Sequence, residues 1–365
     1  MEQLKLLTPG PLTTTHTVKE TMILDRCTWD DDYKKLTQSI RQRLLEIAKV
    51  NAENYTTILQ QGSGSFVVES VIQTAISSTD HVLIISNGAY GKRMIDMAYV
   101  AGKKLTELNI SFDVIPSLAK IQQVLEENPT ITHIAFVHCE TTTGILNPIE
   151  SICTLAKKFN KKIIVDAMSS FGGVPIEVEK LQIDFLVSSA NKCIQGVPGF
   201  GFVIAKKESL EKTKGNARSV SLDLYDQWIV MKDSGKWRFT SPTHVVAAFH
   251  QAILELENEG GVEARYERYL TNNQYIIQSM QQLGFKPYID DEYQSPIITT
   301  FLYPDTNFEF DDFYQYMKKN NFVLYPGKLM DVPSFRVGNI GDLYRQDFEV
   351  MIQHIKNFNA QRSIK

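Results

Sequence analysis

The sequence predicts an α/β protein built around a mostly parallel sheet, followed by a smaller α+β unit. Apolar, β-branched runs at residues 163–165, 185–187 and 202–205 suit strands that are buried on both faces of such a sheet. Upstream of them, strand-like runs alternate with helical patterns at the spacing of right-handed βαβ units. Beyond residue 260, short strands alternate with helices in a pattern that is typical of an α+β unit.

The chain of 365 residues is long enough for a large hydrophobic core and for more than one domain. We expect an N-terminal segment at residues 1–15, a large α/β domain at 16–260 and a small α+β domain at 261–365. The net charge of −4 argues against general binding to nucleic acids or anionic membranes.

The four cysteines are scattered and form no CxxC pair, which argues against a disulfide framework or a metal site. We therefore expect reduced thiols and a cytoplasmic location. No apolar stretch approaches the roughly 18 residues that cross a bilayer. The N-terminus also lacks the basic-then-apolar pattern of a signal peptide.

In the large domain, strands are expected where short apolar runs end in polar or glycine-rich turns. Helices are expected where apolar residues recur every three or four positions. Besides the three runs named above, these patterns predict strands at 55–59, 81–86 and 132–138, and helices at 36–47, 67–76 and 149–159.

Helical patterns dominate after residue 205. Residues 221–231 are amphipathic, and a long helix at 243–259 follows Pro242 and ends at two glycines. The remaining elements are expected to be helices at 262–283, 311–319 and 342–358, and strands at 297–301, 323–325 and 334–337.

A carboxylate and an amine follow two of the buried runs. Asp166 comes directly after residues 163–165, and Lys192 follows residues 185–187 through small and polar residues. Because open α/β sheets bind ligands at the carboxyl ends of their strands, both side chains are expected at one rim. Desolvation there would lower the pKa of Lys192 and make its amine nucleophilic. The pair suits an amine that forms a Schiff base with a cofactor; a structural salt bridge is the alternative.

A Gly/Ser turn at residues 60–65 lies between a predicted strand and a predicted helix. Free backbone N–H groups, hydroxyls and the positive end of the helix dipole suit a phosphate there, although an ordinary N-cap is the alternative. It is not a Walker loop, since no Gly-Lys-Ser/Thr follows. Tyr90, at another strand-to-helix turn, can lie against a flat ligand or serve as a core aromatic.

The order of these features resembles the class V, fold-type I aminotransferases over essentially the whole chain. The segments that carry the resemblance are 7–11, 27–30, 59–65, 140–144, 189–193, 237–244 and 335–341. Within that class they are most similar to the 2-aminoethylphosphonate–pyruvate aminotransferases. The resemblance implies a seven-stranded sheet flanked by helices, a small C-terminal domain and the cofactor pyridoxal 5′-phosphate.

The resemblance also implies how the cofactor is held. Lys192 would form the Schiff base and then move the substrate proton, and Asp166 would pair with the ring nitrogen. Tyr90 would stack on the ring, and Thr141 would lie near the ring hydroxyl. The phosphate contacts implied are Gly64, Ser65 and Phe66, with Thr240 reaching over from the second subunit of a homodimer.

Substrate binding is implied for three further positions. Arg336 would bind the phosphonate of the amino donor and the carboxylate of pyruvate, since its planar fork suits both anions. Pro9 and Gly10 would line the substrate pocket. The expected reaction gives phosphonoacetaldehyde and L-alanine in a ping-pong cycle.

Other readings remain open from the residues alone. An alanine–glyoxylate or serine–pyruvate aminotransferase would use the same cofactor residues with another donor. A cysteine desulfurase would have a histidine immediately before the lysine, where this chain has Asn191. The motif that usually flanks the lysine of a phosphoserine aminotransferase is also missing from this chain. A non-catalytic module that binds a phosphate ligand is the alternative from another class.

Overall fold

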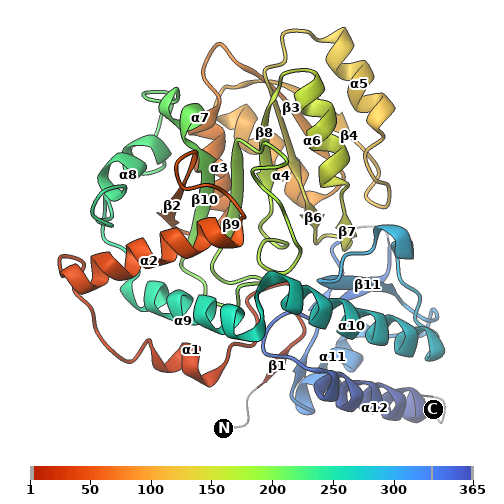
Figure 1. The fold of residues 1–365 in the computed structure, drawn as a ribbon. Helices are drawn as coiled ribbons and strands as arrows, with labels where there is room; N and C mark the ends of the chain where they lie inside the picture. Colours follow the sequence, from red (N-terminus) through yellow and green to blue (C-terminus); the bar gives the residue numbers. More distant parts are fainter. Residues whose placement is uncertain (1–3, 330–331, 363–365) are drawn as a thin grey trace.

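The computed structural model describes residues 4–329 and 332–362, and a seven-stranded sheet lies at its centre (Figure 1). The strand order is β2-β10-β9-β8-β5-β3-β4. The strands are β2 (Tyr55–Gln61), β3 (His81–Ser86), β4 (Lys104–Asn109), β5 (His133–Val137), β8 (Lys162–Asp166), β9 (Phe185–Ser189) and β10 (Phe200–Lys206). Neighbouring strands are parallel, except that β10 is antiparallel to both β2 and β9. The predicted fold class is confirmed.

Alternate side chains of the central strands enter two separate cores. In β8, Ile163 and Val165 pack on one side of the sheet, whereas Ile164 packs on the other. Because helices cover both faces, a strand in this sheet is apolar along its whole length rather than at every second residue. The first face is covered by α2 (Asp31–Ile47), α5 (Leu118–Glu127), α6 (Ile149–Lys158) and α9 (Thr243–Glu259), and the second by α3 (Gly64–Ala75), α4 (Ala89–Val100) and α8 (Leu224–Met231).

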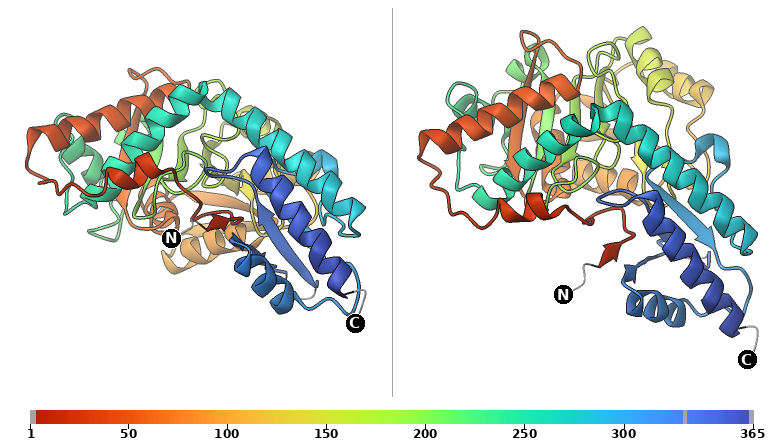
Figure 2. Two further views of the ribbon diagram at one scale, coloured as in Figure 1. Left: turned by 90° about the horizontal axis from the view of Figure 1, so that it is seen from below. Right: turned by 60° about the horizontal axis from the view of Figure 1, so that its bottom comes forward.

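A second, antiparallel sheet of three strands lies beyond α9, in the order β11-β14-β13. It packs with three helices around a core rich in phenylalanine, and the views in Figure 2 place this unit beside the large sheet, next to the N-terminal segment. The elements are β11 (Ile298–Leu302), β13 (Tyr325–Pro326), β14 (Ser334–Gly338), α10 (Gly261–Gln282), α11 (Phe310–Lys319) and α12 (Arg345–Arg362).

The N-terminal segment is tied to this second unit. Strand β1 (Lys5–Leu6) pairs in parallel with β12 (Phe322–Val323), and the Gly338 amide at the end of β14 donates to the Leu7 carbonyl at 3.0 Å. Residues five to seven therefore lie against strands that come more than 300 positions later in the chain.

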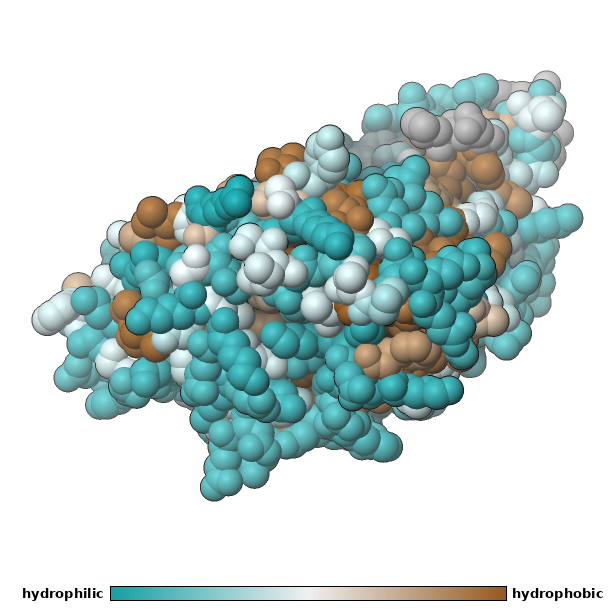
Figure 3. Space-filling view, turned by 90° about the horizontal axis from the view of Figure 1, so that it is seen from above, coloured by the Kyte–Doolittle hydropathy of each residue, from teal (hydrophilic) through white to brown (hydrophobic). Residues whose placement is uncertain are grey.

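The other elements are short, and the surface is largely polar. In Figure 3, hydrophilic residues cover most of the upper face, and hydrophobic residues form small separate patches. Among the described residues, no helix is both long and apolar enough to cross a membrane. The short elements are α1 (His16–Glu20), α7 (Lys207–Glu211), β6 (Cys139–Glu140), β7 (Ile145–Leu146) and the 3₁₀ helix η1 (Asp291–Tyr293).

Several boundaries differ from the sequence prediction. Helix α8 begins at Leu224 rather than 221, because the Asp223 side chain caps it by accepting from the Asp226 amide. The single strand predicted at 323–325 is divided between β12 and β13, which belong to different sheets. The closing helix begins at Arg345 rather than 342.

Candidate active site

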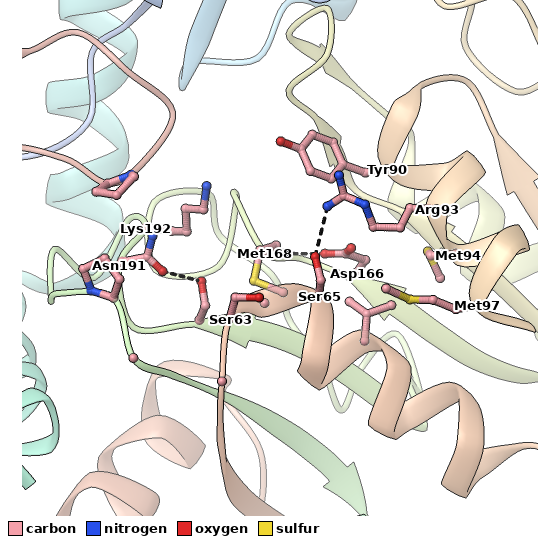
Figure 4. A pocket seen from close by; sticks show the side chains of 17 residues that line it. Ser63, Ser65, Tyr90, Arg93, Met94, Met97, Asp166, Met168, Asn191 and Lys192 are labelled. Atoms are coloured by element: carbon pink, nitrogen blue, oxygen red, sulfur yellow. Dashed lines mark hydrogen bonds between the residues drawn. The ribbon is translucent and has the colours of Figure 1, made fainter. Parts of the chain in front are cut away.

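Loops that follow the central strands meet at one edge of the large sheet and enclose a cavity of about 540 Å³ (Figure 4). Five of the residues predicted from the sequence line it, namely Gly64, Ser65, Tyr90, Asp166 and Lys192. The reversed direction of β10 contributes to this arrangement, since its first residue, Phe200, lies opposite Gln61 at the end of β2. The loops before α3 and before β10 are therefore neighbours, and the Gly62 amide donates to the Gly199 carbonyl at 3.0 Å.

Lys192 lies three residues beyond the end of β9. Its Nζ donates to the carbonyl oxygen of Pro9 at 2.8 Å, so the N-terminal segment reaches the cavity. A Cβ at Gly10, where φ is +111°, would lie 2.8 Å from the Lys192 Cδ, so only glycine fits there without strain. Burial lowers the pKa of Lys192, although Tyr90 and other neighbours partly oppose the shift. A larger fraction of the amine is therefore neutral at a given pH.

Asp166 is the last residue of β8, and it is 5% exposed. Its Oδ1 accepts a hydrogen bond from the Met168 amide at 2.9 Å. Burial raises the pKa of Asp166 to about 6, even though this hydrogen bond and the positive charge of Lys192 favour the ionised form. Among the described residues, this carboxylate has no salt-bridge partner.

The N-terminus of α3 forms a small polar cradle on the same cavity. Its N-cap, Ser63, makes no side-chain cap, and within the described chain the amides of Gly64 and Ser65 have no hydrogen-bond acceptor. A Cβ at Gly64 would lie 2.5 Å from the Met168 sulfur, so the backbone approaches the loop after β8 closely. Phe66 is placed differently: its amide donates to the Ser63 carbonyl at 3.0 Å, and its side chain is 53% exposed.

Tyr90 is the second residue of α4, and the buried side chain of Glu140 fixes this helix start. One carboxylate oxygen accepts from the amides of Tyr90 (3.1 Å) and Gly91 (3.2 Å), and the other from the amide (3.1 Å) and hydroxyl (2.6 Å) of Thr142. Burial nevertheless raises the pKa of Glu140. A Cβ at Gly88 would meet this side chain at 2.2 Å. Glu140 belongs to the segment 140–144 singled out in the sequence, but its hydrogen bond to the Tyr90 amide could be seen only in the folded structure.

Cations surround the Tyr90 ring. The Arg93 Cζ lies 5.1 Å and the Lys328 Nζ 4.3 Å from the ring centroid. Burial favours the neutral phenol, but Lys192, Lys328, a hydrogen bond with Thr141 and Arg336 together lower the pKa of Tyr90. This part of the site is therefore electropositive.

Arg93 is a site residue that the sequence analysis missed. Its Nη1 donates to the Ser65 hydroxyl at 3.0 Å, and Figure 4 shows its side chain between Tyr90 and Ser65. The spacing of three residues from Tyr90 was a usable signal, since positions i and i+3 share a helix face.

Arg336 and Thr141 lie side by side but are not among the residues that line the cavity. The Arg336 Nη1 donates to the Thr141 carbonyl at 2.9 Å, and its Nε donates to the Pro326 carbonyl at 3.0 Å. Arg336 is 3% exposed, and burial lowers its pKa. The guanidinium is thus held rigidly by backbone carbonyls, without a carboxylate partner among the described residues.

Thr240 lies outside the cavity, on the exposed segment before α9. Large apolar side chains on and near this segment are exposed as well, including Phe239 (50%), Val220 (72%) and Trp29 (70%). Val220 and Trp29 both lie beside this segment, because Arg238 donates to the Val220 carbonyl at 2.6 Å and Lys236 lies over the Trp29 ring at 5.4 Å. An apolar patch of this kind typically marks an interaction surface.

Comparison with known proteins identifies the family. The family model described as "Aminotransferase class-V" matches residues 29–352. The chain belongs to the class-V aminotransferases. A class-V relative from Lysinibacillus sphaericus (strain C3-41), named 2-aminoethylphosphonate--pyruvate transaminase, is 60% identical over 98% of both chains. The predicted family and its aminotransferase activity are confirmed.

Solved structures of other aminotransferases share the fold of this class-V chain. An alanine–glyoxylate aminotransferase from Nostoc sp. superposes with a TM-score of 0.88 at 24% identity, covering 98% of this chain and 95% of the other. A PLP-bound phosphoserine aminotransferase from Trichomonas vaginalis gives 0.76 at 17% identity, covering 96% and 99%. At these identities the likeness establishes the architecture alone.

Proposed function

We propose that this class-V aminotransferase transfers the amino group of 2-aminoethylphosphonate to pyruvate, giving phosphonoacetaldehyde and L-alanine. The observation that carries the proposal is the 60% identity, over nearly the full length of both chains, to a relative named for this reaction. The buried amine of Lys192 and the buried carboxylate of Asp166 on one cavity agree with it.

The cavity suits pyridoxal 5′-phosphate, the cofactor that the family implies. Asp166 would pair with the ring nitrogen, because a buried carboxylate with no salt-bridge partner among the described residues gains most from a protonated ring. Tyr90 would lie on the ring. The phosphate would find the amides of Gly64 and Ser65, which have no acceptor among the described residues, together with the dipole of α3 and the guanidinium of Arg93. When bound, the cofactor withdraws electrons from the carbon that loses its proton.

Lys192 is the residue that would move this proton. Because its pKa is lowered, the amine is available in its neutral form as a base. The Pro9 carbonyl accepts from Nζ and so fixes the direction in which the amine points. Pro9 and Gly10 would thereby form one wall of the substrate pocket. Thr141 would lie near the ring hydroxyl, since its side chain bonds to Tyr90.

Arg336 would bind the acidic group of each substrate. Its two carbonyl contacts use two of its five N–H donors, so three remain to face an anion. A planar fork of this kind binds two oxygens of a phosphonate or of a carboxylate equally well. The same residue can therefore serve both halves of the reaction.

We further propose a homodimer in which Thr240 approaches the partner's cofactor phosphate. The exposed apolar residues around it, with Phe66 at the edge of the cradle, would be covered by the second subunit. A cytoplasmic location is also proposed, because the four cysteines are all free and three of them are buried.

One spectroscopic experiment tests the function. Purified protein is loaded with pyridoxal phosphate, and its visible absorbance is followed on adding 2-aminoethylphosphonate and then pyruvate. We expect the visible absorption band of the Schiff base between Lys192 and the cofactor to fall when the aminophosphonate is added. The band should return with pyruvate as L-alanine appears. If only alanine or serine bleaches the band, the donor is wrong. The Lys192→Ala variant should show neither band nor turnover, and a variant that keeps both would remove Lys192 from its role.

A further inference from the structure

Lys328 is a cation beside Tyr90 that takes no part in the cofactor contacts proposed above. It lies in the loop after β13, is half-buried, and places its Nζ 4.3 Å from the centroid of the Tyr90 ring. Within residues 4–329 and 332–362, no carboxylate lies within 4.0 Å of this ammonium group. Its position over an aromatic face leaves its N–H donors available to a ligand.

The same hairpin holds Lys328 and Arg336. Tyr325 and Pro326 of β13 pair with Arg336 and Phe335 of β14, and the Pro326 carbonyl accepts from the Arg336 Nε at 3.0 Å. Lys328 follows Pro326 by two residues. Arg336 thus lies in the small sheet and Lys328 in the loop just beyond its partner strand, and both act on the Tyr90 hydroxyl electrostatically.

The carboxylates near these cations are already engaged. Glu140 accepts four hydrogen bonds from the start of α4 and from Thr142, and Asp166 accepts the Met168 amide. Neither has a salt bridge in the described part of the chain. The region around Tyr90 therefore carries a positive charge that a bound anion would balance.

The shape of the two acidic groups then separates the two substrates. The remaining donors of Arg336 form one planar fork, which can hold two oxygens. A carboxylate has no further oxygen, whereas a tetrahedral phosphonate has a third one out of that plane, and it can carry a second negative charge. A compact ammonium group that needs no fixed plane suits this third oxygen.

We propose that Lys328 binds the third oxygen of the phosphonate and so makes the site prefer a phosphonate over a carboxylate. This inference rests on the proposed function and deepens it, since it names the residue that distinguishes the amino donor from the keto acid. Arg336 supplies the anion contact common to both substrates, and Lys328 supplies the additional contact for the phosphonate.

The test uses two unreactive ligands that differ only in the acidic group, ethylphosphonate and propanoate. Their dissociation constants are measured by calorimetry on the cofactor-loaded protein and on its Lys328→Gln and Lys328→Arg variants. Lys318→Gln is the matched control, because Lys318 also lies over a tyrosine ring, that of Tyr314 at 5.8 Å, on the exposed side of α11. Unchanged thermal midpoints would establish that the variants are folded.

For Lys328→Gln we expect ethylphosphonate to bind about 10- to 100-fold more weakly, the range for losing one charge-assisted hydrogen bond, and propanoate to change by less than about threefold. Lys328→Arg should retain part of the preference, and Lys318→Gln all of it. Equal losses for both ligands, or no loss for either, would overturn the inference.

The failure of this inference is distinguishable from the failure of the proposed function. Turnover of 2-aminoethylphosphonate by the unaltered protein is measured separately. If that turnover occurs while Lys328→Gln leaves the phosphonate preference intact, only the role of Lys328 fails. If the phosphonate preference depends on Lys328 but no amino group reaches pyruvate, the role of Lys328 is supported and the proposed reaction fails.

Discussion

Replacing Asp166 with asparagine should make the cofactor-free protein more stable above about pH 6. Burial raises the pKa of Asp166 from 3.8 to about 6. At 1.36 kcal/mol per pKa unit, this shift corresponds to a penalty of about 3 kcal/mol for the ionised, folded state. Asparagine carries no charge at any pH, and it keeps the oxygen that accepts from the Met168 amide.

The sign of the pH dependence follows from this shift. The folded state holds the proton more tightly than the unfolded state, so the stability of the unaltered protein falls as the pH rises from about 4 to about 6 and then levels off. The stabilisation by Asp166→Asn should therefore grow over this interval and reach about 3 kcal/mol at about pH 8.

Urea unfolding of the cofactor-free protein at about pH 5 and about pH 8 measures the effect. Asp96→Asn serves as a control, because Asp96 lies exposed on α4. The reasoning would be refuted if the free energies of unfolding of Asp166→Asn and the unaltered protein differed equally at both pH values, or if the variant were the less stable one at the higher pH. With pyridoxal phosphate bound the order should reverse, since the ring nitrogen loses its partner.

Three other substitutions probe the site. In a fluorescence titration, Arg93→Gln should weaken the binding of pyridoxal phosphate about 10- to 100-fold but leave the affinity for pyridoxal, which lacks the phosphate, unchanged. Equal losses for both ligands would contradict the phosphate contact, and Lys92→Gln is the control. Arg336→Ala should raise the KM of both substrates about 100-fold with the cofactor still bound, and loss of the cofactor's absorbance would contradict this role. Gly88→Ala should cost about 1–3 kcal/mol in urea unfolding, because its Cβ would lie 2.2 Å from the Glu140 side chain, and unchanged stability would show that this contact relaxes freely.

The sequence predicted the buried part of the fold better than its edge. The β8 and β9 strands stand out as β-branched runs because both of their faces are covered. Strand β4 (Lys104–Asn109) was missed, since it is an edge strand with mostly polar, partly exposed residues that carry no clear period. A helix was expected to start near Tyr90, but the extent of α4 was not predicted, so Arg93 on its next turn had no predicted place.

The candidate site was predictable where a residue's role depends on its own strand. Asp166 and Lys192 follow buried strands, and the rule for strand ends brings them to one rim. Arg93 and Lys328 could not be found this way, because neither follows a buried strand: Arg93 lies one turn after Tyr90 on α4, and Lys328 approaches the Tyr90 ring from the loop after β13. The role proposed for Thr240 depends on a second chain, which a single sequence does not contain.

The N-terminal segment connects the small sheet to the loop after β9 of the large sheet. At one end its backbone is hydrogen-bonded to β12 and to the end of β14, the strand that carries Arg336. A few residues later, the Pro9 carbonyl holds the Lys192 amine. A shift of the small sheet when an anion reaches Arg336 would therefore pull on the carbonyl that restrains the lysine. A protein without residues 1–11 would therefore lose this link between the strand of Arg336 and the Lys192 amine, even if both sheets remained folded.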